Sequence, residues 1–185
     1  SLKEATLAKG VEKIDSMAFS YCSSLEKIEI PDTVTSIGDY AFMYCEGIKE
    51  INIPKTVTSF TNGIFYGCSS LEKFTVYKEL ENVGNYPFLG CKSMKNIEVE
   101  DGNENYISEN GVLFSSDKKI LVAYPCGNGE KSYTVPDEVE EIASSAFFDN
   151  ENIEEVKFGS GLKYIDEGVF DFCSAIKSVL IPENV

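Results

Sequence analysis

The chain has 185 residues, of which 43% are hydrophobic and 25% are charged, and this is the composition of an ordinary globular domain. Its 16 basic and 31 acidic residues give a formal net charge of −15, and a surface this acidic repels phosphate backbones and anionic lipid, so we expect no nucleic-acid partner. The absence of histidine excludes Ser–His and Cys–His catalytic pairs and removes the commonest metal ligand.

A repeat with a period of 23 residues organises the chain. Residues 1–10 match the second half of one unit, four regular units follow without gaps over 11–102, and two more occupy 139–184. The shared pattern is V-x-x-I, then A-F-x-x-C, then L-x-x-I-x-I-P. A unit this short cannot bury its own apolar face, so neighbouring units must stack into a solenoid. Because the pattern is cut at both ends, we expect one solenoid domain over 1–185 that is a fragment of a longer protein.

Each part of the unit predicts a different local structure. In L-x-x-I-x-I the last two apolar residues, such as Ile28 and Ile30, alternate with polar ones, as a half-buried strand requires. The proline that follows ends the strand, because it cannot donate to the ladder. The segment around Ala18-Phe19 suits one or two helical turns, and V-x-x-I favours a short second strand or an extended corner. The expected fold is an α/β, β-rich, right-handed solenoid with a parallel concave sheet of eight strands.

The irregular unit (103–138) interrupts the period. Within it, residues 111–125 hold two apolar runs joined by a polar Ser-Ser-Asp-Lys turn, which predicts a hairpin. Tyr133-Thr134-Val135-Pro136 then restores the sheet strand. Insertions in solenoids leave from one face, and that face often binds a partner. We favour a hairpin that covers a local apolar patch over one that binds.

Five of the six cysteines share one repeat position, with one thiol per layer: Cys22, Cys45, Cys68, Cys91 and Cys173. A column of buried thiols is favoured over disulfides between layers, since Asn150 holds the same position in another unit. Cys126 lies off this column and is the cysteine that we suspect of reactivity. No C-x-x-C zinc pair occurs, and the stretch 101–105 lacks the glycine and final glutamate of a calcium loop. We therefore expect neither a metal nor a cofactor.

The outward-facing strand positions form a polar grid of mixed charge that is poor in aromatic residues. An ordinary solvated surface and a protein-binding face explain this grid about equally well. Binding there would be hydrogen-bonded and partly salt-sensitive, because the chain has no Trp anchor. At another repeat position, Tyr21, Tyr44 and Phe172 either pack between layers or form an aromatic patch at an edge. The candidate contact residues of the grid are Lys27, Glu29, Glu50, Asn52, Lys73, Thr75, Asn96, Glu98, Thr134, Glu155 and Lys157.

The motif IGDYAFMYCEGIKEINIP (37–54), its copies, and the variant GVLFSSDKKILVAYP (111–125) resemble the BspA-like (Treponema pallidum-type) leucine-rich-repeat family. The resemblance covers nearly the whole chain. It implies a surface or secreted protein of a host-associated bacterium, acting as a non-catalytic adhesion or protein-binding module. The partner implied is a protein, such as host extracellular matrix or another bacterial surface protein.

Three further points bear on function. The alternative to a binding module is an architectural spacer that presents another domain of a larger surface protein. The family has no shared catalytic residues to carry over, and no spacing here singles out a carboxylate pair for glycoside hydrolysis. No apolar run reaches the length of a membrane helix, so we expect no membrane insertion. The sequence does not indicate an oligomeric state.

Overall fold

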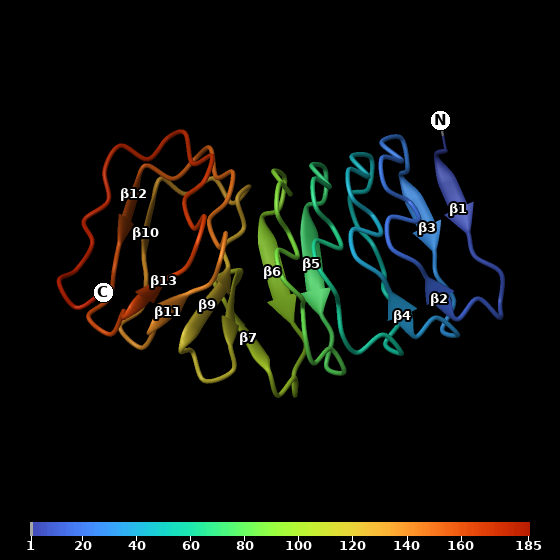
Figure 1. Ribbon diagram of the computed structural model, residues 1–185, viewed down its shortest axis with the longest axis horizontal. Coiled ribbons are helices and arrows are strands. Elements are labelled where there is room, and N and C mark those ends of the chain that lie inside the picture. The colour runs from blue at the N-terminus through green and yellow to red at the C-terminus, as the bar shows by residue number, and fades with distance from the viewer. Residues whose placement is uncertain (1) are drawn as a thin grey trace.

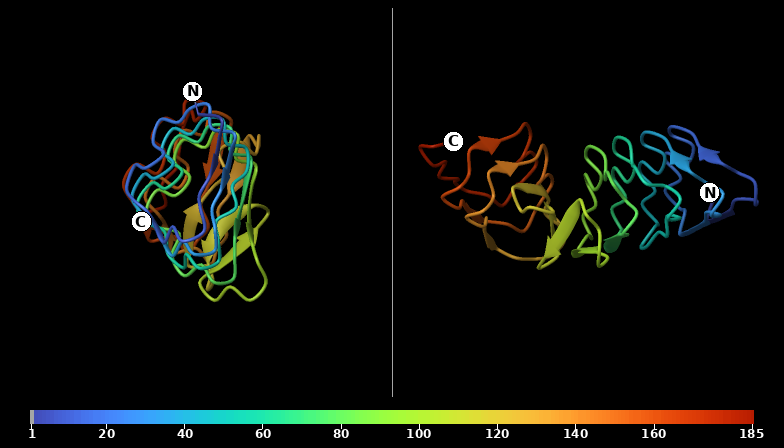
Figure 2. Two further views of the ribbon diagram at one scale, coloured as in Figure 1. Left: turned by 90° about the vertical axis from the view of Figure 1, so that its right-hand side faces the viewer. Right: turned by 90° about the horizontal axis from the view of Figure 1, so that it is seen from below.

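The computed structural model describes residues 2–185, and Ser1, the first residue of the expected partial repeat, lies outside them. The repeats stack along the long axis of the molecule, with the two ends of the chain at opposite ends of the stack (Figure 1). Seen down that axis the repeats lie over one another, and the yellow-green segment around residue 110 projects beyond their outline (Figure 2). The solenoid is β-rich, and no helix occurs among residues 2–185.

Strands from the L-x-x-I-x-I motif pair in parallel with a register of one repeat. Glu4 lies opposite Lys27, and Lys73 lies opposite Asn96. Along these strands the apolar residues are buried and the polar ones exposed, as the alternation predicts. The pairs are β1 (Glu4–Thr6) with β3 (Lys27–Glu29), β5 (Lys73–Val76) with β6 (Asn96–Val99), and β10 (Ser132–Thr134) with β12 (Glu155–Lys157).

The expected continuous sheet of eight strands is wrong. The motif strands form three separate pairs, because residues 50–53 are not hydrogen-bonded as a strand and an inserted hairpin separates β6 from β10. The V-x-x-I segments do form short strands on a second ladder. They are β2 (Lys13–Ile14) with β4 (Ser36–Ile37) and β11 (Glu141–Ile142) with β13 (Tyr164–Ile165). Between these pairs, the third and fourth repeats are linked by an isolated parallel bridge between Ser59 and Asn82.

The A-F segments are irregular turns, so the expected helical turns are also wrong. In every regular repeat the residues two before and two after the Phe adopt positive φ, as do Tyr40 (56°) and Tyr44 (55°) around Phe42. An α-helix needs consecutive right-handed residues, and these left-handed positions break it. Their N–H groups donate to the next repeat instead, for example Tyr40 to the carbonyl of Asn62 at 2.9 Å and Tyr44 to that of Tyr66 at 2.7 Å. The turns therefore stack as a hydrogen-bonded column.

The irregular unit contains the predicted hairpin and one more strand. β8 (Val112–Ser115) pairs antiparallel with β9 (Ile120–Ala123), which confirms the hairpin. β7 (Tyr106–Glu109) precedes them and pairs antiparallel with β8 through a tight turn at Asn110-Gly111. β9 also pairs in parallel with β11, so it continues the V-x-x-I ladder. The unit is thus a shortened repeat preceded by an inserted strand and turn.

Buried aromatic rings form the spine of the core. Phe42, Phe65 and Phe88 are stacked with centroids 6.1 Å apart at each step, and Phe147 lies 5.4 Å from Phe170. Tyr124 takes the ring position of the irregular unit, 4.7 Å from Phe147. The ring column follows the period, because each regular repeat places a Phe at the same position, whereas Tyr124 lies in the irregular unit outside the period.

Candidate functional site: the strand face

The strand face consists of the exposed side chains of the motif strands, and it contains all eleven candidate contact residues. Lys27 and Glu29 lie on β3, Lys73 and Thr75 on β5, and Asn96 and Glu98 on β6. Ten of the eleven are exposed, whereas Asn96 is half-buried. On the C-terminal side the face continues with Thr134 on β10 and with Glu155 and Lys157 on β12.

The strands β7 and β8, with the turn between them, divide the strand face into two patches. The N–H of Ile97 on β6 donates to the carbonyl of Gly111 at 3.0 Å, so the turn between β7 and β8 occupies the edge of β6. A β-carbon built on Gly111 would lie 2.7 Å from Oδ1 of Asn96, which accounts for the partial burial of Asn96. The structure therefore brings the first eight candidates together, up to Glu98. It separates them from Thr134, Glu155 and Lys157.

Within the N-terminal patch (the eight candidates from Lys27 to Glu98), residues 50–53 do not pair with the strands on either side, and we call this segment the open rung. The amide of Glu72 donates to the carbonyl of Lys49 at 3.0 Å, so the segment is still tied to the next repeat at its start. From residue 50 to 53, no backbone hydrogen bond joins it to β3 or β5 in the part of the chain that the structure describes. Backbone N–H and C=O groups without a protein partner are available to water or to a ligand.

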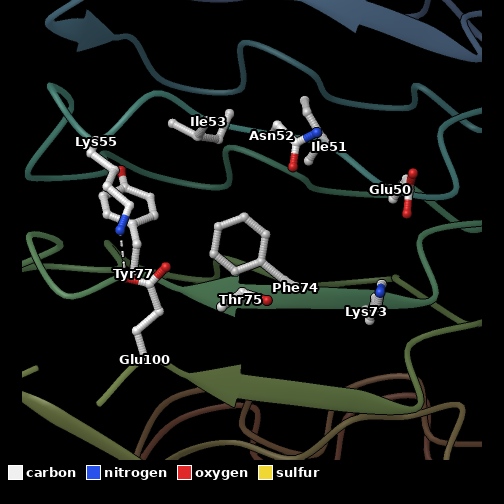
Figure 3. A pocket seen from close by; sticks show the side chains of 10 residues that line it. All are labelled: Glu50, Ile51, Asn52, Ile53, Lys55, Lys73, Phe74, Thr75, Tyr77 and Glu100. Carbon is white, nitrogen blue, oxygen red and sulfur yellow. Dashed lines mark hydrogen bonds and ion pairs between the residues drawn. The ribbon is translucent and has the colours of Figure 1, made fainter. Parts of the chain in front are cut away.

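A hollow of about 240 Å³ lies between this open rung and β5 (Figure 3). The ring of Phe74 lies in the gap between the two segments, and Asn52 and Thr75 lie on either side of it (Figure 3). Glu50 and Lys73 stand at one end, and neither forms an ion pair with any of residues 2–185. The hollow thus combines an apolar floor with one unpaired charge of each sign.

The other end of the hollow is closed by an ion pair between repeats. Lys55 donates to the carboxylate of Glu100 at 2.7 Å (Figure 3). Glu79 lies 3.6 Å from the same ammonium. The hydrogen bond from Lys55, together with the backbone N–H of Lys78, lowers the pKa of Glu100 below its usual value. Elsewhere on the face, Lys27 donates to Glu29 at 2.8 Å and lowers the pKa of that carboxyl. These charges are already partnered, which leaves Glu50 and Lys73 as the unpaired charges that line the hollow.

All six cysteines are free, and within the column the thiols of Cys45, Cys68, Cys91 and Cys173 donate to backbone carbonyls of the preceding repeat. Cys68 donates to the carbonyl of Phe42 at 3.1 Å, for example. The suspicion that Cys126 is reactive is wrong: it is buried, its thiol donates to the carbonyl of Cys91 at 2.9 Å, and burial raises its pKa to about 12. It continues the column, because the shortened turn after Tyr124 brings it beneath Cys91. A thiol held neutral this firmly is a poor nucleophile.

The remaining motifs resolve as follows. Tyr21 and Phe172 are exposed at 67% and 71%, yet each packs on a ring of the neighbouring repeat, Tyr21 on Tyr44 and Phe172 on Phe148, both at 5.1 Å. The turn after β6 is held by Asn103, whose amide donates to the carbonyls of Tyr77 and Leu80 at 2.9 Å each.

Among residues 2–185 there is no group of three or more His, Cys, Asp or Glu side chains placed to share a metal ion. The same residues contain no helix long and apolar enough to cross a membrane.

Solved structures with the same fold come from bacteria. The crystal structure of the pneumococcal vaccine antigen PcpA is 31% identical with a TM-score of 0.85, and the match covers 96% of this chain and 45% of that one. A leucine-rich repeat protein from Eubacterium ventriosum is 27% identical with a TM-score of 0.86, covering 100% of this chain and 55% of that one. The chain thus spans about half the length of these two relatives. No curated protein matches it.

A third structure, a leucine rich cell surface protein from Faecalibacterium prausnitzii, is 23% identical with a TM-score of 0.73 and supports the fold alone. The match covers 100% of this chain and 62% of that one. In sequence, six copies of the family described as BspA type leucine rich repeat region match residues 1–120 and 125–185. The repeat period, the stacked cysteines and this match agree, and the chain belongs to the BspA-type leucine-rich-repeat family.

Proposed function

We propose that this chain is a non-catalytic, extracellular protein-binding module of a bacterial surface protein, and that its strand face makes the contact. Membership of the family and the similarity to a pneumococcal vaccine antigen at 31% identity support an extracellular repeat domain. The partner is a protein, of the host extracellular matrix or of another bacterial surface. The alternative function is an architectural spacer, and the experiment below distinguishes it from a binding module.

The open rung at residues 50–53 is the observation that carries this proposal. It offers unpartnered backbone groups next to an apolar floor at Phe74 and to the unpaired charges of Glu50 and Lys73. Small hot spots of this kind, with an apolar centre and a polar rim, are where protein interfaces concentrate their binding energy. An extended segment of a partner that places one apolar side chain in the hollow would also satisfy both charges.

The test is binding of the chain to immobilised fibronectin, fibrinogen, mucin and bacterial surface proteins at low and high salt. The informative variant combines Glu50→Lys with Lys73→Glu, because it reverses both charges at the hollow while the net charge stays at −15. We expect saturable binding that weakens by about tenfold or more in this variant, as for paired charges at an interface core.

A control variant combines Lys9→Glu with Glu12→Lys, two exposed residues outside the strand face. It also preserves net charge and should bind like the unaltered chain. Binding that both variants retain would move the contact away from the hollow. No binding to any member of the panel would favour the spacer.

A further inference from the structure

The turns of the N-terminal half carry a row of tyrosines that is separate from the strand face. Tyr66 lies edge-on to Tyr44 with ring centroids 5.3 Å apart, and edge-on to Tyr40 at 6.3 Å. Glycines lie against these rings: a β-carbon built on Gly63 would be 2.4 Å from the ring of Tyr40, and one on Gly67 would be 2.5 Å from that of Tyr44. The rings are therefore fixed by packing between repeats, and they form a rigid aromatic platform.

This row ends in a cleft between turns that are distant in sequence. The hydroxyl of Tyr86 donates to the carboxylate of Glu167 at 3.0 Å, across 81 residues. Lys92 spans the same gap and pairs with Glu151 at 2.6 Å. Both contacts pass over the irregular unit, whose turn is shortened at Tyr124-Pro125-Cys126. The turn of the last repeat consequently faces the tyrosines.

The cleft has a volume of about 350 Å³ and two chemically different walls. Tyr40, Tyr66 and Tyr86 form one wall, and Glu167 and Asp171 form the other. Both carboxylates are exposed, and neither takes part in an ion pair with another of residues 2–185. No Lys or Arg side chain lines the cleft.

Gly168 keeps the cleft open. It occupies the repeat position that Tyr40 and Tyr86 hold in their own repeats, and it has the same left-handed backbone, with φ of 63°. Without a side chain there, the carboxylate of Asp171 reaches over the glycine, within 3.1 Å of where a β-carbon would lie. A tyrosine at 168, like those of the second and fourth repeats, would fill this space.

The two walls attract the same kind of ligand. The faces of aromatic rings carry negative potential and bind cations, and a carboxylate accepts charge-assisted hydrogen bonds from ammonium or guanidinium groups. The net charge of −15 adds a long-range field of the same sign. We propose that this cleft binds an organic cation, an ammonium or guanidinium group, which belongs either to a lysine or arginine side chain of a partner protein or to a small free amine.

Tyrosine fluorescence can report the binding of a cation to the cleft. The chain has no Trp, so its intrinsic fluorescence comes from ten tyrosines, three of which line the cleft. The probes are N-acetyl-arginine amide, tetramethylammonium and the neutral isostere N-acetyl-citrulline amide. We expect saturable changes in tyrosine emission with the two cations, weakened by added salt, and none with citrulline amide. Equal binding of the citrulline and arginine amides, or no saturable change with either cation, would overturn the proposal.

Paired variants locate the site. Glu167→Gln with Asp171→Asn removes two charges from the cleft, and affinity for both cations should fall by about tenfold. Glu12→Gln with Asp32→Asn removes two charges from exposed residues of the first regular repeat that do not line the cleft, and it should leave affinity unchanged within about twofold. Equal losses in the two variants would show only a general field effect and would contradict a cleft site.

A further comparison separates the two sources of the cation. A short peptide with a central arginine that binds more tightly than N-acetyl-arginine amide indicates a partner protein, because flanking residues then add contacts. Equal affinity indicates a small free amine. Binding of methyl glucoside in place of either cation would assign the cleft to a sugar and overturn the proposal. None of these outcomes depends on the strand face, so this inference and the proposed function can fail separately.

Discussion

At the scale of single residues, the column of aromatic rings shows how the repeat is converted into stability. Phe65 is fully buried, and four other Phe rings lie within about 6 Å of it, at 5.3 Å (Phe74), 5.9 Å (Phe60) and 6.1 Å (Phe42 and Phe88). A ring of this kind contributes through the apolar area it removes from water and through contacts on both its faces. A position in the middle of the column therefore matters more than one at its end.

We predict that Phe65→Ala lowers the free energy of unfolding by about 3–5 kcal/mol, because it leaves a cavity between two stacked repeats. Phe19→Ala is the matched control. Phe19 is half-buried and stacks on one ring, that of Phe42 at 5.7 Å, so its loss should be clearly smaller. Denaturant unfolding of the two variants measures both values. A loss below about 1 kcal/mol for Phe65→Ala would contradict the stacked core.

At the scale of elements, the tight turn at Asn110-Gly111 sets the position of the inserted strands. Asn110 and Gly111 have φ of 51° and 80°, the left-handed values that a two-residue hairpin turn needs. The same glycine contacts β6 through the hydrogen bond from Ile97. The turn thus both folds β7 onto β8 and ends the N-terminal patch of the strand face.

We predict that Gly111→Ala destabilises the chain by more than Gly129→Ala. The two glycines have nearly the same φ, 80° and 81°, so an alanine carries a similar backbone cost of about 1 kcal/mol at each. A β-carbon on Gly129 meets nothing within 4 Å, whereas one on Gly111 would lie 2.7 Å from the side chain of Asn96. Thermal unfolding of both variants isolates that contact. Equal shifts in melting temperature would mean that the turn between β7 and β8 does not pack tightly against Asn96 of β6.

The elements also show which parts of the structure the sequence can predict. The strands, their register and the ring column follow from the period, because each repeat packs on a copy of itself. The prediction of helical turns was wrong because residue type alone does not indicate that Tyr40 and Tyr44 adopt a left-handed backbone. Hydrogen bonds to the next repeat hold that conformation. β7 was missed although Asn110-Gly111 is the ordinary signal for a two-residue hairpin.

The candidate site was predicted only in part. The strand-face residues are where the alternation places them, yet the open rung at 50–53 has the same pattern as its neighbours, so the sequence does not signal it. The cleft between Tyr86 and Glu167 joins residues 81 apart, and no periodic signal connects them. The cleft depends on how the irregular unit fits between its neighbours, which the period does not specify.

At the scale of the whole molecule, the buried residues form two clusters that meet at β8. Leu113 belongs to the cluster of the N-terminal repeats, whereas Val112 and Phe114 belong to that of the C-terminal repeats. All three are buried, so this strand is covered on both faces. In a solenoid each repeat is stabilised by its neighbours, and cooperativity passes along the stack through such shared interfaces. β8 therefore couples the two halves, together with β9, which places Ala123 in the first cluster and Leu121 in the second.

We predict that the unaltered chain unfolds in one cooperative transition and that Leu113→Ala separates it into two. The substitution should cost about 2–5 kcal/mol, as for other buried leucines, and the loss falls on the interface between the clusters. Leu25→Ala is the control, because Leu25 is equally buried but lies in the first regular repeat. It should lower stability while the halves still unfold together. Hydrogen exchange measured across a denaturant series reports residues 11–102 and 139–176 independently. Identical exchange behaviour of both halves in the Leu113 variant would show that coupling runs through the Tyr86–Glu167 and Lys92–Glu151 contacts instead.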